Sequence, residues 1–264
     1  MSFFSKKQAA HEAFKLFCTP FFTNVVSKPL IYLQAKPVKF LSHGRKVKGY
    51  RWQQSSTNKK VMIIHGFASA SYKFEKYIIS LMNKGYEVLA FDAPAHGKSQ
   101  GKTVNVIQYK NMIEKAVAKF GPVDMYIAHS FGGLALSLAL ENMPHDENTK
   151  VTLIAPLTET STTMDKFLEK LGIKDEEIRS EMDSIVLHMS HQTTEWFSIK
   201  RAMRNITAKV LWIHDEDDDI TPLSDAKLVQ EKQFENITFH ITKELGHHQI
   251  YQDNEVREMV INFL

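Results

Sequence analysis

The sequence predicts an α/β protein with a mostly parallel sheet and helices on both of its faces. Two segments of alternating polarity, residues 38–41 and 47–52, are joined by a short turn and predict an antiparallel hairpin. Short apolar runs such as 61–64 follow the hairpin, as expected of strands that are buried on both faces. These runs alternate with amphipathic segments of helical period, which is the pattern of parallel strands joined by helical crossovers.

The first element is an amphipathic segment ahead of the hairpin. Residues 3–18 place Phe3, Ala10, Phe14 and Phe17 at helical spacing, with charged residues between them. We expect this helix to dock on the body of the protein, and a membrane-surface or dimer-contact arm is the alternative. Prolines then break the chain into a segment that connects the helix to the hairpin.

Beyond the hairpin, apolar runs alternate with amphipathic segments along the chain. Strands are predicted over 61–64, 86–91, 123–127, 151–154, 210–213 and 237–241. Helices are predicted over 72–83, 104–120, 134–142, 224–233 and 253–264. The alternation pauses after Pro156, where roughly fifty residues have a helical pattern. A segment of that length is a separate inserted unit rather than a connection.

The composition is that of a globular protein. The chain has 264 residues, of which 43% are hydrophobic and 24% are charged, and its net charge is +3. Lysine and arginine do not gather in a block, so a nucleic-acid partner is not expected. No run approaches the length of a membrane span and no signal-peptide pattern is present, so stable membrane insertion is not expected. The single cysteine, Cys18, predicts a buried thiol and a reducing, cytoplasmic location.

A candidate nucleophile stands between a predicted strand and a predicted helix. The motif AHSFGG at 128–133 places Ser130 between small residues two positions before and two positions after it. This is the pattern of a nucleophile elbow, a tight turn that projects the serine hydroxyl from the strand end. The helix N-terminus behind it offers unpaired backbone N–H groups to an anion. Alanine replaces glycine at 128, and an ordinary strand–turn–helix packed by small residues is the alternative.

A serine hydroxyl becomes a nucleophile only when a base takes its proton, and a carboxylate normally orients that base. The loop after the predicted strand 210–213 contains four candidate acids, which are Asp215, Asp217, Asp218 and Asp219. Spacing alone does not decide which of these four aspartates orients the base. A solvated loop or a cation site is the alternative, although a calcium loop would also need a turn glycine and further oxygen ligands.

A candidate base follows the last predicted strand, at Gly246-His247-His248. A glycine before a histidine lets the chain turn so that an imidazole reaches inward. We expect one of the two histidines to be the base and the other to be a surface or wall residue. Metal ligation is the alternative, but adjacent side chains seldom converge on one ion, and we expect no metal.

Two further strand ends carry polar motifs. At His65-Gly66-Phe67, we expect Gly66 to adopt an unusual backbone angle that turns the Phe67 N–H toward the reaction centre, and a plain loop is the alternative. Residues 92–99 predict a structural turn whose polar side chains bond the backbone, so neither Asp92 nor His96 is expected to be catalytic.

His129 stands directly before the candidate nucleophile. Successive side chains diverge at a tight turn, so we expect the His129 imidazole to point away from the reacting carbonyl.

Taken together, these motifs resemble those of the α/β-hydrolase superfamily. The resemblance covers residues 38–264, and its motifs occur in the family's order at successive strand ends. It implies an eight-stranded-type sheet flanked by helices, an inserted helical cap that forms one wall of an acyl pocket, and an extra N-terminal helix. The implied units are an N-terminal arm at 1–35, a hydrolase core at 36–155 and 206–264, and a cap at 156–205.

The resemblance also implies roles for particular residues. Ser130 matches the family's nucleophile, and the acid, four residues before the proline of its loop, matches Asp218. The base directly follows a glycine, which selects His247. The oxyanion donors correspond to the backbone N–H groups of Phe67 and Phe131.

The chain departs from the family pattern where glycine is usual, at Ala95 and Asp215. Ala95 affects only a turn, whereas Asp215 adds negative charge near the acid.

The expected activity is that of a serine hydrolase acting on a carboxylic ester or thioester of a small-molecule acyl substrate, with no metal or organic cofactor. An acyltransferase, a peptidase or a carbon–carbon hydrolase on the same residues is the alternative, as is a non-catalytic binding protein on this scaffold. Phe67, Phe131 and the apolar cap residues favour an apolar acyl pocket. The acyl length and the oligomeric state stay open.

Overall fold

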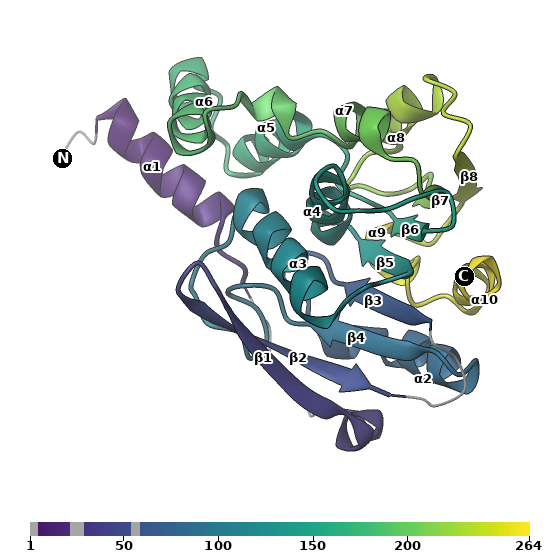
Figure 1. The fold of residues 1–264 in the computed structure, drawn as a ribbon. Helices are drawn as coiled ribbons and strands as arrows, with labels where there is room; N and C mark the ends of the chain where they lie inside the picture. Colours follow the sequence, from purple (N-terminus) through teal and green to yellow (C-terminus); the bar gives the residue numbers. More distant parts are fainter. Residues whose placement is uncertain (1–4, 22–28, 54–58) are drawn as a thin grey trace.

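The computed structural model describes residues 5–21, 29–53 and 59–264, and it centres on one eight-stranded sheet (Figure 1). The strand order is β1-β2-β4-β3-β5-β6-β7-β8. The strands are β1 (Lys36–Ser42), β2 (Arg45–Trp52), β3 (Lys60–Ile64), β4 (Glu87–Phe91), β5 (Met125–His129), β6 (Lys150–Ile154), β7 (Lys209–Asp215) and β8 (Ile237–Thr242). β2 is antiparallel to both of its neighbours and all other neighbouring pairs are parallel, so the predicted fold class is confirmed.

The predicted hairpin is confirmed at β1 and β2. Its two turn residues, His43 and Gly44, have φ angles of 47° and 71°. Two consecutive positive φ angles match the two-residue turn whose twist suits a hairpin. Ser42 pairs directly with Arg45, so Arg45 belongs to β2 rather than to the turn.

Helices cover both faces of the sheet (Figure 1). The α-helices are α1 (Lys6–Phe17), α2 (Glu75–Asn83), α3 (Val106–Phe120), α4 (Phe131–Leu140), α5 (Thr160–Lys170), α6 (Glu176–Ser190), α7 (Ile199–Ala202), α8 (Leu223–Gln230), α9 (Gly246–Gln249) and α10 (Asn254–Phe263). The 3₁₀ helices are η1 (Leu30–Gln34), η2 (Ser71–Phe74), η3 (Thr194–Trp196) and η4 (Met203–Asn205).

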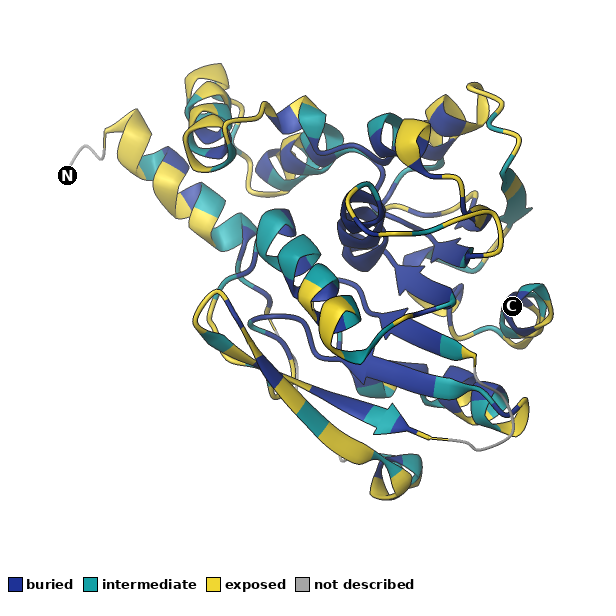
Figure 2. Ribbon diagram, viewed as in Figure 1, coloured by how far each residue is buried: buried dark blue, intermediate teal, exposed yellow. Residues whose placement is uncertain are grey.

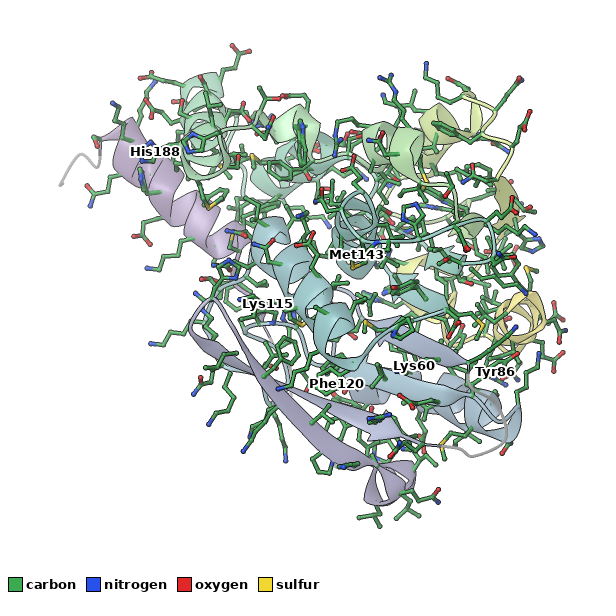
Figure 3. All side chains as sticks on the ribbon, viewed as in Figure 1. Lys60, Tyr86, Lys115, Phe120, Met143 and His188 are labelled. Atoms are coloured by element: carbon green, nitrogen blue, oxygen red, sulfur yellow. The ribbon has the colours of Figure 1, made fainter. Side chains whose placement is uncertain are left out.

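The hydrophobic core is divided by the sheet into two clusters, and side chains fill the space between the sheet and its helices (Figure 3). β3 illustrates the division, because successive side chains of a strand point to opposite faces. Val61 and Ile63 join the cluster that contains residues of α2 and α10, whereas Met62 and Ile64 join the cluster of α3 and α4. Burial on both faces explains why these strands read as uninterrupted apolar runs.

Helix α4, which begins directly after Ser130, is buried along its whole length (Figure 2). It packs against β5, α3 and α7, and it contains no charged residue. Helices that are buried on every side are apolar all round, as α4 is. The element behind the candidate nucleophile is therefore held on all sides.

The segment between β6 and β7 folds into α5, α6, η3, α7 and η4, in agreement with the helical pattern expected there. Its two ends are joined where they meet the sheet. Glu159 and Ser198 form an isolated antiparallel bridge, and the N–H of Ile199 donates to the carbonyl of Thr158 at 2.8 Å. The segment therefore leaves the core and returns to it at neighbouring points.

Helix α1 docks on the body of the protein, as expected, where it packs against α6 and α5. Ala10 and Ala13 are buried, and the N–H of Val104 donates to the carbonyl of Cys18 at 2.8 Å. The Cys18 thiol is buried as expected, and burial raises its pKa to about 12. Phe3, which was expected to begin this helix, lies outside the described residues. Within the described ranges, no helix has both the length and the apolar character needed to cross a membrane.

Several element boundaries differ from those predicted. β5 spans Met125–His129 and therefore ends directly at Ser130, two residues beyond the prediction. Residues 71–74 form a 3₁₀ turn before α2. The short helix α9 was not predicted, because its four residues are too few to show a periodic pattern.

Candidate active site

Ser130 forms the sharp turn between β5 and α4. Its φ and ψ angles are 54° and −126°, in a region that residues with a side chain seldom occupy. Backbone hydrogen bonds hold this conformation, because the Ser130 N–H donates to Ile154 at 3.1 Å and its carbonyl accepts from Gly133 at 2.8 Å and from Leu157 at 3.0 Å. The predicted elbow is therefore present, and neighbouring segments hold its strained residue in place.

Close packing explains the glycines around the elbow. A Cβ at Gly132 would lie 2.5 Å from the carbonyl oxygen of His65, and a Cβ at Gly66 would lie 2.9 Å from the Cβ of Ser130. The expectation of an unusual backbone angle at Gly66 is wrong, because Gly66 is not among the residues with positive φ. The glycine is needed there for space: the end of β3 passes directly against the elbow.

The substitution Gly132→Ala is expected to be destabilising. The added methyl group meets backbone atoms at the end of β3, which cannot move aside as a flexible side chain could. Overpacking of this kind typically costs about 1–3 kcal/mol of the free energy of unfolding. Urea denaturation measures the change, and Ser184→Ala on the exposed face of α6 is the control. Equal stability of the Gly132→Ala variant and the parent chain would contradict the packing argument.

The imidazole of His247 lies between Ser130 and Asp218. Its Nε2 is 2.9 Å from the Ser130 Oγ, and its Nδ1 is 2.8 Å from an Asp218 carboxylate oxygen. With a proton on Nδ1 donated to Asp218, the Nε2 lone pair can accept the serine hydroxyl proton. Gly246 has a φ of +55°, so the glycine makes the turn that brings His247 inward, as predicted.

Asp218 is buried and faces His247. One carboxylate oxygen accepts from the N–H groups of Ile220 at 2.9 Å and Thr221 at 2.8 Å, and the other accepts from the Thr221 hydroxyl at 2.8 Å as well as from His247. Burial by itself would raise the pKa of Asp218, but these hydrogen bonds outweigh it and hold the pKa below its ordinary value. The carboxylate is therefore charged at neutral pH and faces the imidazole.

Asp215, where the family pattern has glycine, joins two loops. It is fully buried, and one carboxylate oxygen accepts from the N–H groups of Asp217 at 3.0 Å and Gly246 at 2.9 Å. The other accepts from the Thr242 hydroxyl at 2.6 Å and the Leu245 N–H at 3.2 Å. Asp215 thus connects the loop of the acid to the loop of His247, and its charge is fully hydrogen-bonded.

The remaining candidates lie away from this centre. Asp217 and Asp219 are exposed, and so is His248, in agreement with the expectation that one histidine is a surface residue. His129 packs behind His247, with its Nε2 3.1 Å from the His247 carbonyl oxygen and the two rings 4.8 Å apart. It therefore supports His247 from the side of β5.

A network of hydrogen bonds that sequence reasoning missed supports the loop after β3. The His65 Nδ1 lies 2.7 Å from the carbonyl oxygen of Gly66, which belongs to the same peptide unit as the Phe67 N–H. The Tyr109 hydroxyl donates to the His65 carbonyl at 2.8 Å, and His96 Nε2 accepts from the Ala68 N–H at 3.0 Å. The position of His65 directly after an apolar strand was the available signal.

The other half of the expected oxyanion hole is at the start of α4. Phe131 is the first residue of this helix, so its N–H has no intrahelical acceptor. The rings of Phe131 and Phe67 meet edge to face, with centroids 5.6 Å apart. The loop after β3 and the start of α4, which carry the expected donors, therefore contact each other beside Ser130.

The segment at 92–99 is a structural turn, as predicted. One Asp92 oxygen accepts from the Ser71 N–H at 3.1 Å and hydroxyl at 2.8 Å, and the other accepts from the Lys98 N–H at 3.0 Å. The Nδ1 of His96 is 2.9 Å from the carbonyl oxygen of Pro94. These contacts assign Asp92 and His96 to holding the turn.

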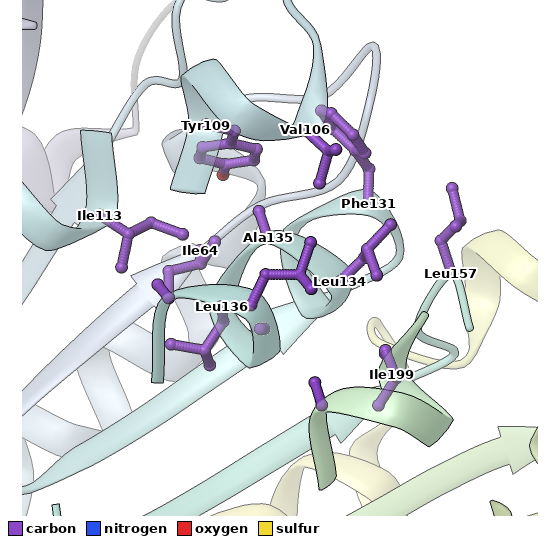
Figure 4. Close-up of a cluster of buried hydrophobic side chains, with 14 of the residues drawn as sticks. Ile64, Val106, Tyr109, Ile113, Phe131, Leu134, Ala135, Leu136, Leu157 and Ile199 are labelled. Carbon is purple, nitrogen blue, oxygen red and sulfur yellow. The ribbon is translucent and has the colours of Figure 1, made fainter. Parts of the chain in front are cut away.

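A cavity of about 340 Å³ opens beside Ser130. Apolar residues make up most of its lining, and Figure 4 shows three of them, Val106, Phe131 and Leu157, within the buried cluster around α4. Its walls include the loop after β3, the starts of α3 and α4, helices α5 and α6, the loops after β6 and β7, and the end of α1. The cavity size is in the range typical of small-molecule sites, roughly 300–1,000 Å³.

Buried histidines around the site predict loss of stability in acid. Burial lowers the pKa of His65, His129 and His214, and it lowers that of His96 to about 3. These groups bind protons more readily in the unfolded chain, so the free energy of unfolding falls as pH drops below about 6.5, by up to about 1.4 kcal/mol per pH unit for each. Urea denaturation at pH 7.5, 6 and 5 measures the trend. Constant stability over this range would contradict the neutral burial of these side chains.

The site combines a strained serine at the end of β5 with an acid after β7 and a histidine after β8. Together with the sheet, these features define a class of protein. The chain has the α/β-hydrolase fold. Residues 55–174 match the model of the family described as serine aminopeptidase, S33. Over 97 residues the chain is 27% identical to the uncharacterized hydrolase YugF of Bacillus subtilis (strain 168), and over 118 residues it is 28% identical to methylesterase 1 of Arabidopsis thaliana.

These two alignments cover 35% and 42% of this chain and 35% and 44% of the respective relatives, so the chain spans less than half of the length of these two relatives. Solved structures agree over more of the chain. The Pyrococcus furiosus esterase Pf2001 superimposes with a TM-score of 0.69 at 19% identity, covering 94% of this chain and 97% of that one. Mouse alpha/beta hydrolase domain-containing protein 10 gives a TM-score of 0.63 at 14% identity, covering 86% and 96%. At these identities the similarity shows the fold.

Proposed function

We propose that the protein is a serine hydrolase that cleaves carboxylic esters or thioesters through an acyl-enzyme intermediate. The observation that carries the proposal is the continuous hydrogen-bonded chain from Ser130 Oγ through the His247 imidazole to Asp218, with distances of 2.9 and 2.8 Å. All three residues are buried, and Ser130 lines a mostly apolar cavity.

The proposed reaction has two halves. Ser130 Oγ attacks the carbonyl carbon while His247 Nε2 takes the hydroxyl proton, and Asp218 stabilises the imidazolium that forms. The intermediate collapses, the carbon–oxygen or carbon–sulfur bond breaks, and His247 gives the proton to the departing alcohol or thiol. Water then attacks the acyl-serine ester with His247 again as base, which releases the carboxylic acid and restores the serine.

The Phe67 and Phe131 N–H groups are the proposed donors to the oxyanion of each tetrahedral intermediate. Removing such a donor typically costs about 3–4 kcal/mol of transition-state stabilisation. The bond between His65 and the Gly66 carbonyl supports this role for Phe67, because fixing one end of a planar peptide fixes the direction of the N–H at the other end.

We further propose that residues 156–205 act as a cap over a core of 36–155 and 206–264, with 1–35 as an added arm. The bridge between Glu159 and Ser198 at the root of the segment supports these boundaries. The buried single cysteine supports a reducing compartment such as the cytoplasm.

The family description favours one second candidate, an aminopeptidase. An aminopeptidase must hold the positively charged amino terminus of a peptide, for which carboxylates are the natural partners. Among the described residues that line the cavity there is no aspartate or glutamate, whereas Lys166 and Lys170 are present. A neutral acyl chain fits this lining better than a cationic peptide terminus does, so the ester or thioester assignment is preferred.

Labelling with a fluorophosphonate tests the proposal against a non-catalytic binding role. The expected result is one covalent adduct, mapped by mass spectrometry to the peptide that contains Ser130 and absent from the Ser130→Ala variant. Ser184→Ala is the matched control, because Ser184 lies on the exposed face of α6. A folded protein that takes up no label under these conditions would refute the hydrolase assignment.

A further inference from the structure

We infer that the N-terminal helix selects the substrate: Phe14 and Phe17 of α1 form the far wall of the acyl site and make the enzyme prefer medium-length acyl chains. The inference rests on the proposed function, and it names both the substrate class and the residues that set it. The chain length follows from the cavity, since a methylene group displaces about as much volume as a water molecule, roughly 30 Å³. A cavity of about 340 Å³ therefore holds on the order of ten such groups.

The cavity runs from the nucleophile to the end of α1. Ser130 and Phe131 line it at the elbow, and Phe14, Phe17 and Cys18 line it on the α1 side. An acyl group attached to Ser130 can therefore extend toward α1 without leaving the cavity. Helix α1 lies beside α5 and α6 (Figure 1), and it supplies part of the cavity wall together with the segment between β6 and β7.

Aromatic contacts join α1 to the opposite wall. The ring of Phe17 meets that of Phe167 on α5 edge to face, with centroids 5.2 Å apart, and the rings of Phe14 and Phe17 are 6.4 Å apart. Both α1 phenylalanines are only half buried although they pack against the core, and the cavity is the space that they border. An acyl chain would cover this apolar surface.

The wall is fixed in place by contacts that do not involve these rings. Ala10 and Ala13 are buried where α1 meets the body of the protein, and the Cys18 carbonyl accepts from Val104 at the start of α3. Lys6 adds ion pairs with Asp175 at 3.1 Å and with a neighbouring glutamate of α6. A substitution of Phe14 or Phe17 can therefore change the cavity while the helix keeps other anchors.

The chemistry of the lining defines the occupant. Lys166 directs its ammonium to the Asp219 carbonyl at 3.2 Å, which leaves its aliphatic stem for the cavity. Burying each additional methylene of a substrate in such a site raises kcat/KM by about fourfold until the space is filled. The mostly apolar lining therefore favours a hydrocarbon acyl chain.

The test compares kcat/KM for p-nitrophenyl acetate, butyrate, octanoate and palmitate. For the parent chain we expect octanoate to exceed acetate by at least about tenfold, with a decline at palmitate. The double variant Phe14→Ala/Phe17→Ala is expected to lower kcat/KM for octanoate by about tenfold and to leave acetate within about twofold. The double variant His11→Ala/Glu12→Ala, on the exposed face of α1, is the control and should keep the parent profile.

A second variant keeps the inference testable if the alanine substitutions loosen α1. Phe17→Trp adds volume to the same wall and is expected to shift the preferred chain toward butyrate, with a thermal melt close to that of the parent. A parent enzyme without preference for octanoate over acetate, or variants that change all esters equally, would overturn the inference. In both cases the proposed function would still hold if acetate hydrolysis depends on Ser130. Acetate hydrolysis that persists in the Ser130→Ala variant would instead refute the proposed function itself.

Discussion

Replacing Ser130 with alanine is expected to lower kcat/KM for p-nitrophenyl acetate by about 10⁵- to 10⁶-fold, the range for removing the nucleophile of such a triad. The variant loses the only atom that bonds to the acyl carbon, while the backbone contacts that hold the turn remain. Alanine fits wherever the serine Cβ fits, so the thermal melt should stay within a few degrees of the parent.

Initial rates at several substrate concentrations measure this effect, and circular dichroism measures the melt. Ser184→Ala on α6 is the matched control and should retain full activity. A folded Ser130→Ala variant with more than about 1% of the parent rate would show that another group performs the chemistry.

Asp218→Asn is expected to lower kcat by about 10⁴-fold with a small change in KM, as when the acid of a triad loses its charge. The amide keeps the shape of the carboxylate, but it no longer stabilises the imidazolium. It can also present an N–H to His247 Nδ1, which reverses the tautomer and leaves Nε2 protonated. Ser130 then has no base, although it stays 2.9 Å from the imidazole.

The control for Asp218→Asn is Asp219→Asn, the exposed neighbour, which should retain at least half of the parent kcat. Because hydrogen bonds hold the pKa of Asp218 below its ordinary value, the carboxylate also stabilises the fold above that pKa. Rates are therefore measured where both variants are fully folded. Equal loss of kcat in both variants would remove the reason to assign the acid to Asp218.

Most of the fold was predictable because its signals are local. A strand such as β3 is buried on both faces, so it appears in the sequence as a continuous apolar run. The turn at Ser130 was predictable for a related reason: only small residues fit beside it, and Gly132 stands within van der Waals contact of the end of β3.

The acid could not be chosen from spacing alone, because four aspartates share one loop and a sequence does not tell which of them turns inward. The family resemblance selected Asp218, and the structure places its carboxylate 2.8 Å from His247. The role of Asp215 was not predictable, since its partner Thr242 ends a later strand, β8, and its partner Gly246 follows that strand.

The contribution of α1 to the cavity could not be predicted from the sequence either. The amphipathic pattern of the helix shows that one face is covered, but it does not say by what. The neighbour of Phe17 is Phe167, and the pairing depends on how the segment between β6 and β7 folds back over the sheet. Long-range contacts of this kind leave no periodic trace in the sequence.

The bridge between Glu159 and Ser198 has a consequence for how this protein could change over time. Because the helical segment departs and rejoins at adjacent points, residues could be gained or lost within it without disturbing the strand register on either side. Under the proposed function, the catalytic residues of the core and the substrate-contacting residues of the inserted segment would then be free to evolve at different rates.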